Sequence, residues 1–235
     1  MRRGIIYYTD NMLFEPIVSV VRQYILASGL PVVSCSLKPI DFGKNVVIDA
    51  ERGYITMFKQ IITALENSTA KYVFFCEHDV LYPISHFAFI PPKDDTFYYN
   101  DNVWRWWFKH STAITYDGLC SLSSMCANRE LALENYYMKM ERIGTAKPEL
   151  LQGREPRLGR LRGYEPGGRR WQKGTGSTNG LETWKSDQPI VDIRHKGTFS
   201  IGKVRLNQFN HPPVGWVEKD INEIPGWKLE ELFSD

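Results

Sequence analysis

The stretch KYVFFCEHDVLYP, residues 71–83, decides the fold of this chain. Five of its first six residues are apolar or aromatic, a run typical of a strand buried on both faces of a parallel sheet. Glu77 and Asp79 follow at once, and residues two apart in an extended chain point to the same side. The sequence therefore predicts two carboxylates on one face, at the carboxyl end of a core strand, where open α/β sheets bind ligands.

Two neighbouring carboxylates repel each other unless a cation lies between them. Mg²⁺ and Mn²⁺ prefer oxygen ligands, and substrate phosphates often complete the shell of Mg²⁺. We therefore expect Glu77 and Asp79 to hold Mn²⁺ or Mg²⁺. The alternative is that both acids merely begin a solvated loop.

Length and composition are those of an ordinary globular protein. The chain has 235 residues, 43% of them hydrophobic and 24% charged, so we expect a single domain, residues 1–235, with a sizeable core. The four cysteines form no C-x-x-C pair, which favours reduced thiols and a cytoplasmic protein. Thr9 and Asp10 interrupt the first apolar run, which predicts a strand rather than a signal peptide. No run approaches the length of a membrane span.

Strand and helix patterns alternate through the first half of the chain. Strands are predicted at residues 4–11, 31–37 and 71–76, helices at 15–29 and 51–67, and a loop at 38–45. This β-α-β-α-β order predicts an α/β fold with a mostly parallel central sheet and helices on both faces. Because such sheets serve many functions, the fold alone does not define an activity.

The end of the first strand should open at the same sheet edge as the two acids. It carries Tyr8, Thr9, Asp10 and Asn11. Tyr8 is a candidate to stack on a base, and Asp10 to accept hydrogen bonds from a base or ribose. Equally, Asp10 or Asn11 would make a good N-cap for the helix that follows.

Tryptophans gather in the segment 96–110, which has strand character. Trp104 and Trp106 would share one face of the strand, with Trp107 beside them. They are candidates for a platform that stacks on a sugar or base ring, although tryptophan is also a common core residue. A short strand at 119–126 and a helix capped by Asn128 are predicted next.

Residues 152–173 form a basic, glycine-rich arm. The arm has seven cationic and two acidic side chains, in a chain whose net charge is +2. Because arginine grips phosphates bidentately, six arginines are candidate acceptor contacts: Arg154, Arg157, Arg160, Arg162, Arg169 and Arg170. The alternative is a solvated loop, since such compositions often stay unfolded.

A second informative stretch, DQPIVDIRHKGTFS, covers residues 187–200. Its short strand leads into Arg194, His195 and Lys196. A histidine between two cations suits a neutral metal ligand, or a place near a diphosphate. The tail, residues 207–235, is rich in proline and tryptophan and is expected to wrap the body of the protein.

Four segments together resemble GT-A-type glycosyltransferases. These are Y-Y-T-D-N at residues 7–11, the helix 51–66, E-H-D-V-L-Y-P at 77–83 and D-I-R-H at 192–195. More narrowly, they resemble small uncharacterised glycosyltransferase-like proteins with E-H-D-V-L-Y-H-P and D-I-R-H signatures. The resemblance runs from about residue 4 to residue 227 and is weakest between 142 and 183.

The resemblance implies a nucleotide-binding α/β sandwich in which an acid-x-acid motif holds Mn²⁺ or Mg²⁺ against the diphosphate of a nucleotide sugar. By position, Asp79 would be the direct ligand and His195 would complete the shell. Glu77 would contact the metal, the ribose or the sugar, although this chain has E-x-D where D-x-D is more familiar. The strand-one residues Tyr8, Thr9 and Asp10 would hold the nucleoside, with a UDP-sugar as the expected donor.

On this reading, residues 4–128 form the nucleotide-sugar half and 129–206 the acceptor half, which includes the arm. The predicted reaction transfers a sugar to a hydroxyl, with the metal and the cations Arg194 and Lys196 stabilising the departing diphosphate. An inverting enzyme also needs a base. Asp187 and Glu165 are the candidates, and the stereochemistry stays open.

The arm and the tryptophans favour hydroxymethylpyrimidine DNA as the acceptor, because it offers phosphates and an extruded base. A cell-envelope or lipid-linked glycan is the competing acceptor.

Two other classes of protein compete with the glycosyltransferase class itself. A nucleotidyltransferase should show a glycine-rich, lysine-containing loop after strand one, and residues 7–16 contain no glycine. A non-catalytic binding module would bind a nucleotide sugar or nucleic acid without metal dependence.

Overall fold

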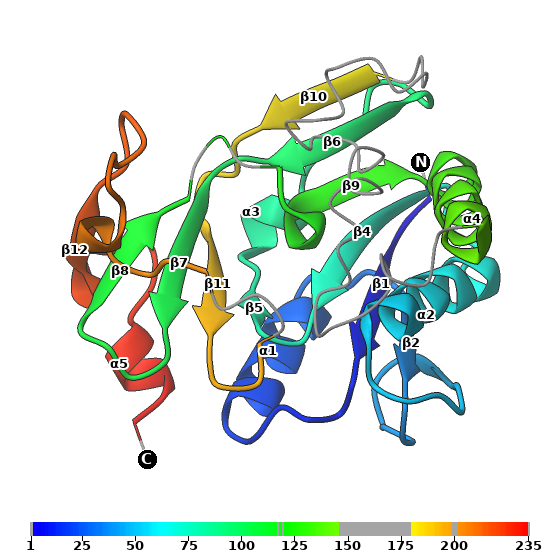
Figure 1. Ribbon diagram of the computed structural model, residues 1–235, viewed down its shortest axis with the longest axis horizontal. Coiled ribbons are helices and arrows are strands. Elements are labelled where there is room, and N and C mark those ends of the chain that lie inside the picture. Colours follow the sequence, from blue (N-terminus) through cyan, green and yellow to red (C-terminus); the bar gives the residue numbers. More distant parts are fainter. Residues whose placement is uncertain (1, 117, 119, 146–179, 199–201, 235) are drawn as a thin grey trace.

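The computed structural model describes residues 2–116, 118, 120–145, 180–198 and 202–234. Within them, two sheets form the body of the protein (Figure 1). The larger sheet has the order β10 (Gly180–Trp184), β6 (Thr96–Asn100), β9 (Met125–Asn128), β4 (Tyr72–Glu77), β1 (Arg3–Thr9), β2 (Val32–Ser36) and β3 (Lys44–Val47). The smaller sheet has the order β12 (Glu218–Asp220), β8 (Thr112–Thr115), β7 (Val103–Trp107), β11 (Ile190–Arg194) and β5 (Val80–Leu81).

The larger sheet is mostly parallel, as predicted. Strands β3, β2, β1 and β4 are parallel neighbours, and β6 is parallel to β10. Only β9, among the described strands of this sheet, runs against both of its neighbours. The carboxyl ends of β1 and β4 therefore lie at one edge, where Tyr8 is paired with Glu77.

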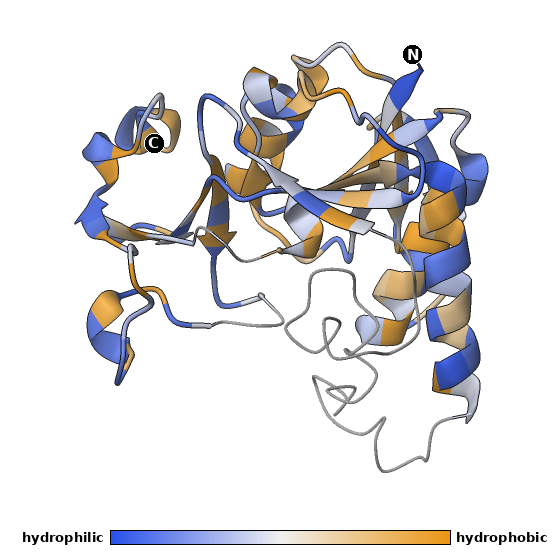
Figure 2. Ribbon diagram, turned by 90° about the horizontal axis from the view of Figure 1, so that it is seen from above, coloured by the Kyte–Doolittle hydropathy of each residue, from blue (hydrophilic) through white to orange (hydrophobic). Residues whose placement is uncertain are grey.

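Each central strand supplies two cores, because alternate residues face opposite sides of a sheet. In β1, Ile5 and Tyr7 belong to one apolar cluster and Ile6 and Tyr8 to the other. The first cluster is covered by α1 (Ile17–Leu26), and the second by α2 (Tyr54–Asn67) and α4 (Arg129–Thr145). Helices thus cover both faces, and apolar residues run along the central strands (Figure 2).

The other helical segments among the described residues are short. They are α3 (Ile84–Phe87), α5 (Leu229–Leu232) and 3-10 turns at Leu122–Ser124, Leu206–Gln208 and Ile221–Glu223. In the tail, the buried Trp227 packs on Tyr24 of α1 and donates a hydrogen bond to the Pro189 carbonyl at 2.8 Å. Among the described helices, none is long and apolar enough to cross a membrane.

The predicted boundary between residues 128 and 129 does not separate the sheets. After it, β10 joins the larger sheet, whereas β11 and β12 join the smaller one. Each predicted half of the chain therefore contributes strands to both sheets.

Several element boundaries differ from the predictions. Strand β3 pairs with β2, and its first two residues lie in the loop expected at 38–45. The strand was not predicted because its residues are exposed or half-buried and show little apolar alternation. Helix α1 begins at Ile17, so neither Asp10 nor Asn11 caps it. The strand expected at 119–126 is a 3-10 turn followed by β9. Asn128 does cap α4, since its Oδ1 accepts from the Glu130 amide at 2.9 Å.

His86 is a fully buried histidine that should make stability sensitive to acid. Four aromatic rings surround it at centroid distances of 5.0 to 5.5 Å, those of Phe74, Tyr82, Phe87 and Trp184. Burial lowers the pKa of His86 to about 3, whereas an unfolded histidine titrates near pH 6.5. Below pH 6.5 His86 is therefore protonated in the unfolded chain but stays neutral in the folded protein, so the free energy of unfolding falls as the pH falls.

We expect His86→Phe to reduce this acid sensitivity. Between pH 7 and pH 5 the wild-type protein should lose about 2 kcal/mol more unfolding free energy than the variant does. Urea unfolding at both pH values measures this difference. His211→Asn is the control, because His211 is exposed and its replacement should leave the pH dependence unchanged. Equal pH dependence in wild type and His86→Phe would contradict the expectation.

Candidate active site

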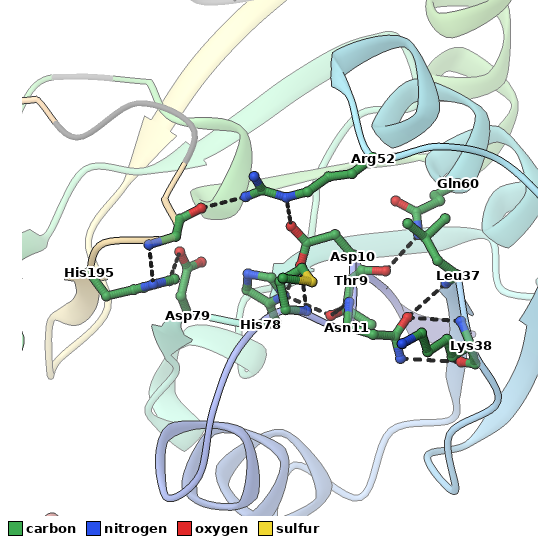
Figure 3. Close-up of polar contacts among 12 residues, drawn as sticks. Thr9, Asp10, Asn11, Leu37, Lys38, Arg52, Gln60, His78, Asp79 and His195 are labelled. Carbon is green, nitrogen blue, oxygen red and sulfur yellow. Dashed lines mark hydrogen bonds and ion pairs between the residues drawn. The ribbon is translucent and has the colours of Figure 1, made fainter. Parts of the chain in front are cut away.

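Three side chains gather where β4 and β11 end (Figure 3). His78 and Asp79 directly follow β4, and His195 directly follows β11. One possible ligand atom from each lies within 4.8 Å of the other two. Asp79 and His195 are buried and His78 is half-buried, so the cluster is enclosed enough to exclude most water.

Asp79 and His195 face each other across the two sheets. Asp79 Oδ2 lies 3.3 Å from His195 Nε2, yet among the described residues this nitrogen has no partner in hydrogen-bonding geometry. Its other nitrogen, Nδ1, accepts from the Gly197 amide at 3.1 Å. Because Nδ1 accepts this bond, the proton of the neutral ring lies on Nε2, toward the Asp79 carboxylate. A metal ion bound to Nε2 would require the ring proton on Nδ1 instead, with the Gly197 amide turned away from it.

Asp79 is held in its charged form. Burial by itself would raise the pKa of Asp79, but His195, His78 and Arg194 together hold that pKa below its ordinary value. The carboxylate is therefore ionised at neutral pH, as a metal ligand must be.

His78 is the site residue that the sequence prediction missed. Its Nδ1 lies 2.7 Å from Thr9 Oγ1 and 3.6 Å from Asp10 Oδ1, which leaves Nε2 available to a cation. Metal-binding histidines commonly have such a partner on the second ring nitrogen. The available signal was the histidine between two acids in E-H-D.

Glu77 does not join the cluster, contrary to the prediction that both acids leave one face. Strand β4 ends at Glu77 and the chain turns through His78 and Asp79, so the two-residue alternation stops there. Glu77 Oε1 instead accepts from the Tyr8 hydroxyl at 2.9 Å. Burial and the charge of Asp79 raise the pKa of Glu77 above its ordinary value.

Arg194 lies beside the cluster and is anchored by a buried carboxylate. Its Nε donates to Asp192 Oδ2 at 3.1 Å, and a terminal nitrogen contacts the same oxygen. Arg105 Nε approaches that oxygen from β7 at 3.3 Å. Arg194 directly precedes His195 in the chain, and the charge of Asp79 acts on its guanidinium. Lys196 is exposed on the loop beyond.

The strand-one residues serve mainly to build the site. Tyr8 is buried in the core, so it offers no ring face to a base. Thr9 contacts His78, and Asp10 pairs with Arg52. Asn11 accepts from the amides of residues 37 and 38 at 2.8 and 2.9 Å, which ties the end of β1 to the loop after β2.

The tryptophans do not form the predicted stacking platform. Trp104 and Trp106 are buried in the core, where no sugar or base can stack on them, and Trp107 is half-buried beside His110. The exposed aromatic ring near the cluster is Phe14, which is 48% exposed. Its ring centroid lies 6.3 Å from that of His195.

Asp187 is misplaced for a catalytic base. It is exposed and precedes β11, whereas His195 follows that strand. The five residues of β11 separate the two by roughly 15 Å at the usual rise per residue. The other candidate base, Glu165, lies outside the described residues. So do all six arginines proposed for the acceptor: Arg154, Arg157, Arg160, Arg162, Arg169 and Arg170.

The donor set fits a transition-metal dication better than Mg²⁺. Two imidazoles and one carboxylate suit Mn²⁺ or Fe²⁺, whereas Mg²⁺ prefers oxygen ligands. The three donor atoms lie within 4.8 Å of one another, so they would have to move toward one another to hold one ion.

No protein-family model matches the chain, and no curated protein sequence matches it. Among solved structures, it is similar to residues 1–349 of S. aureus TarS, with 14% identity and a TM-score of 0.43 over 82% of this chain and 60% of that one. It is also similar to a glycosyltransferase involved in glycosylation of the major capsid of PBCV-1, with 8% identity and a TM-score of 0.41 over 79% of this chain and 82% of that one.

A third similar structure is Drosophila β-1,4-galactosyltransferase 7, solved as a mutant with manganese, UDP-Gal and xylobiose. It shares 13% identity and a TM-score of 0.36 over 60% of this chain and 52% of that one. The chain thus spans less than two thirds of the TarS and Drosophila chains. Glycosyltransferases are thus among the solved structures to which the chain is similar.

Proposed function

We propose that this chain is a metal-dependent glycosyltransferase that moves a sugar from a nucleotide diphosphate sugar to a hydroxyl group. The cluster of His78, Asp79 and His195 carries the proposal. His78 and Asp79 lie at the carboxyl end of β4 in the mostly parallel larger sheet, where α/β proteins bind nucleotides, and His195 follows β11 of the smaller sheet. The guanidinium of Arg194 next to the cluster supplies a fixed positive charge, which suits an anionic diphosphate.

Each residue of the site would have its own role in the reaction. His78, Asp79 and His195 would hold the dication, for which their donor atoms favour Mn²⁺ over Mg²⁺. When bound, this ion supplies Lewis-acid stabilisation to the departing diphosphate. Arg194, held in place by Asp192, stabilises the same developing charge. Asp79 stays ionised throughout, because His195, His78 and Arg194 keep its pKa low.

For the substrates, we propose a UDP-sugar as the donor and hydroxymethylpyrimidine DNA as the acceptor. The DNA proposal is supported by the composition of the basic arm alone, because residues 152–173 lie outside the described part of the chain. A cell-envelope or lipid-linked glycan is the competing acceptor. The cluster favours an enzyme over a nucleotide-sugar-binding module, because such a module would not need a metal ion.

We expect UDP release from UDP-glucose to require Mn²⁺ and to fall by more than about 100-fold in Asp79→Asn, which keeps the shape of the side chain but removes its charge. Purified protein would be incubated with Mn²⁺, with hydroxymethylpyrimidine DNA or without an acceptor. Released UDP and the masses of the digested nucleosides would be measured.

The outcomes separate the alternatives. A nucleoside heavier by one hexose, absent with Asp79→Asn, supports both the enzyme class and the DNA acceptor. Metal-dependent UDP release without a modified nucleoside retains the enzyme class and shifts attention to glycans. If no common nucleotide sugar is turned over with any divalent metal, the binding module becomes the better proposal.

A further inference from the structure

Arg52, which was not among the predicted site residues, bridges two parts of the site (Figure 3). It lies just before α2, and its Nε contacts the carboxylate of Asp10 at the end of β1. A terminal nitrogen of the same guanidinium donates to the carbonyl of Gly197, in the loop after β11. One side chain thus connects the larger sheet to the loop that follows a strand of the smaller sheet.

Each end of this bridge leads to one histidine of the cluster. On one side, Asp10 Oδ1 lies 3.6 Å from His78 Nδ1. On the other, the Gly197 carbonyl that Arg52 contacts lies two residues after His195, so Arg52 holds the loop that carries this histidine. His195 Nε2 is the nitrogen that faces Asp79.

We propose that Arg52 is a positioning residue that holds His78 and His195 at the separation needed to bind one metal ion. This inference rests on the metal site of the proposed function and extends it to a residue outside the ligand set. Groups that bond to the second nitrogen of a ligating histidine set the orientation of its ring, and their loss commonly costs about 10- to 100-fold in metal affinity.

The geometry explains why an arginine occupies this position. A guanidinium offers donors in a rigid plane, so Nε and a terminal nitrogen can serve two acceptors in different directions at once. A lysine ammonium at residue 52 would keep the charge but lack the fixed fork. The bridge therefore depends on shape as well as charge.

The same contacts give Asp10 a different role from the nucleoside contact predicted from the sequence. Its side chain is only 9% exposed and is paired with Arg52. Within this proposal, Asp10 faces His78 and anchors Arg52, and it acts on the metal through His78. The two roles predict different binding defects when Asp10 is changed.

The test measures Mn²⁺ affinity without nucleotide, by the electron paramagnetic resonance signal of free Mn²⁺. We expect Arg52→Gln to raise the Kd for Mn²⁺ by about 10- to 100-fold, and Arg52→Lys to restore it only in part. Lys59→Gln is the matched control, since it removes one exposed positive charge from α2 and should leave the Kd unchanged. Thermal unfolding midpoints verify that each variant is folded.

Three results would contradict the proposal, and they are distinguishable. If wild-type protein binds Mn²⁺ and Arg52→Gln binds it equally well, Arg52 does not position the histidines. If wild-type protein binds no Mn²⁺, the metal site of the proposed function fails as well. If Asp10→Asn weakens UDP binding at saturating Mn²⁺ but leaves the Kd for Mn²⁺ unchanged, Asp10 contacts the nucleoside and the bridge is not needed for the metal.

Discussion

His78→Ala is expected to weaken Mn²⁺ binding by more than about 100-fold, whereas Glu77→Gln should leave it within about threefold of the wild-type value. The reason is geometric. His78 contributes a ligand atom to the cluster with Asp79 and His195, and losing one of three protein ligands costs more than losing a group that only orients one. Glu77 is directed to the Tyr8 hydroxyl instead.

Isothermal titration with Mn²⁺ measures both variants, and circular dichroism verifies their fold. The comparison is sharp because the two residues are adjacent in sequence, Glu77 as the last residue of β4 and His78 as the first residue after it. A large loss of affinity in Glu77→Gln with little change in His78→Ala would overturn the ligand set, and would restore the acid-x-acid arrangement predicted from the sequence.

The second large effect is expected at Arg194. Arg194→Ala should lower kcat for sugar transfer by about 100- to 1,000-fold, the usual cost of removing a preorganised group that stabilises transition-state charge. The Kd for Mn²⁺ should change little, because Arg194 is not a ligand. Its guanidinium is held next to the cluster by Asp192, whose Oδ2 accepts from Arg194 Nε at 3.1 Å.

Chemical rescue distinguishes this role from a structural one. Added guanidinium at millimolar concentration should restore part of the kcat of Arg194→Ala and none of that of Asp79→Asn, since only the first variant leaves a guanidinium-sized space beside Asp192. An unchanged kcat in Arg194→Ala would remove Arg194 from the mechanism. A lower kcat accompanied by an equally weakened Kd for Mn²⁺ would instead indicate that the variant disturbs the cluster.

Local patterns in the sequence were sufficient to predict the parallel strands β1, β2 and β4 at the centre of the larger sheet. The apolar run before Glu77 indicated a doubly buried strand, and β4 has its first five residues buried. The alternation of strands and helices predicted parallel neighbours, which β1, β2 and β4 are. These features are predictable because side-chain periodicity and burial are properties of a few consecutive residues. Strand β3 was missed since it lacks that periodicity.

The sequence by itself therefore determined the central parallel strands, the helices on the two faces of the sheet, and the presence of Asp79 and His195 at strand ends. Only the tertiary structure decided which side chains meet. The turn after β4 directs Glu77 to Tyr8 and brings His78 into the cluster. Antiparallel pairing of β11 with β5, together with the bond from the Ile193 amide to the Asp79 carbonyl at 2.8 Å, sets His195 beside Asp79. That register joins residues more than a hundred positions apart, and no local pattern encodes it.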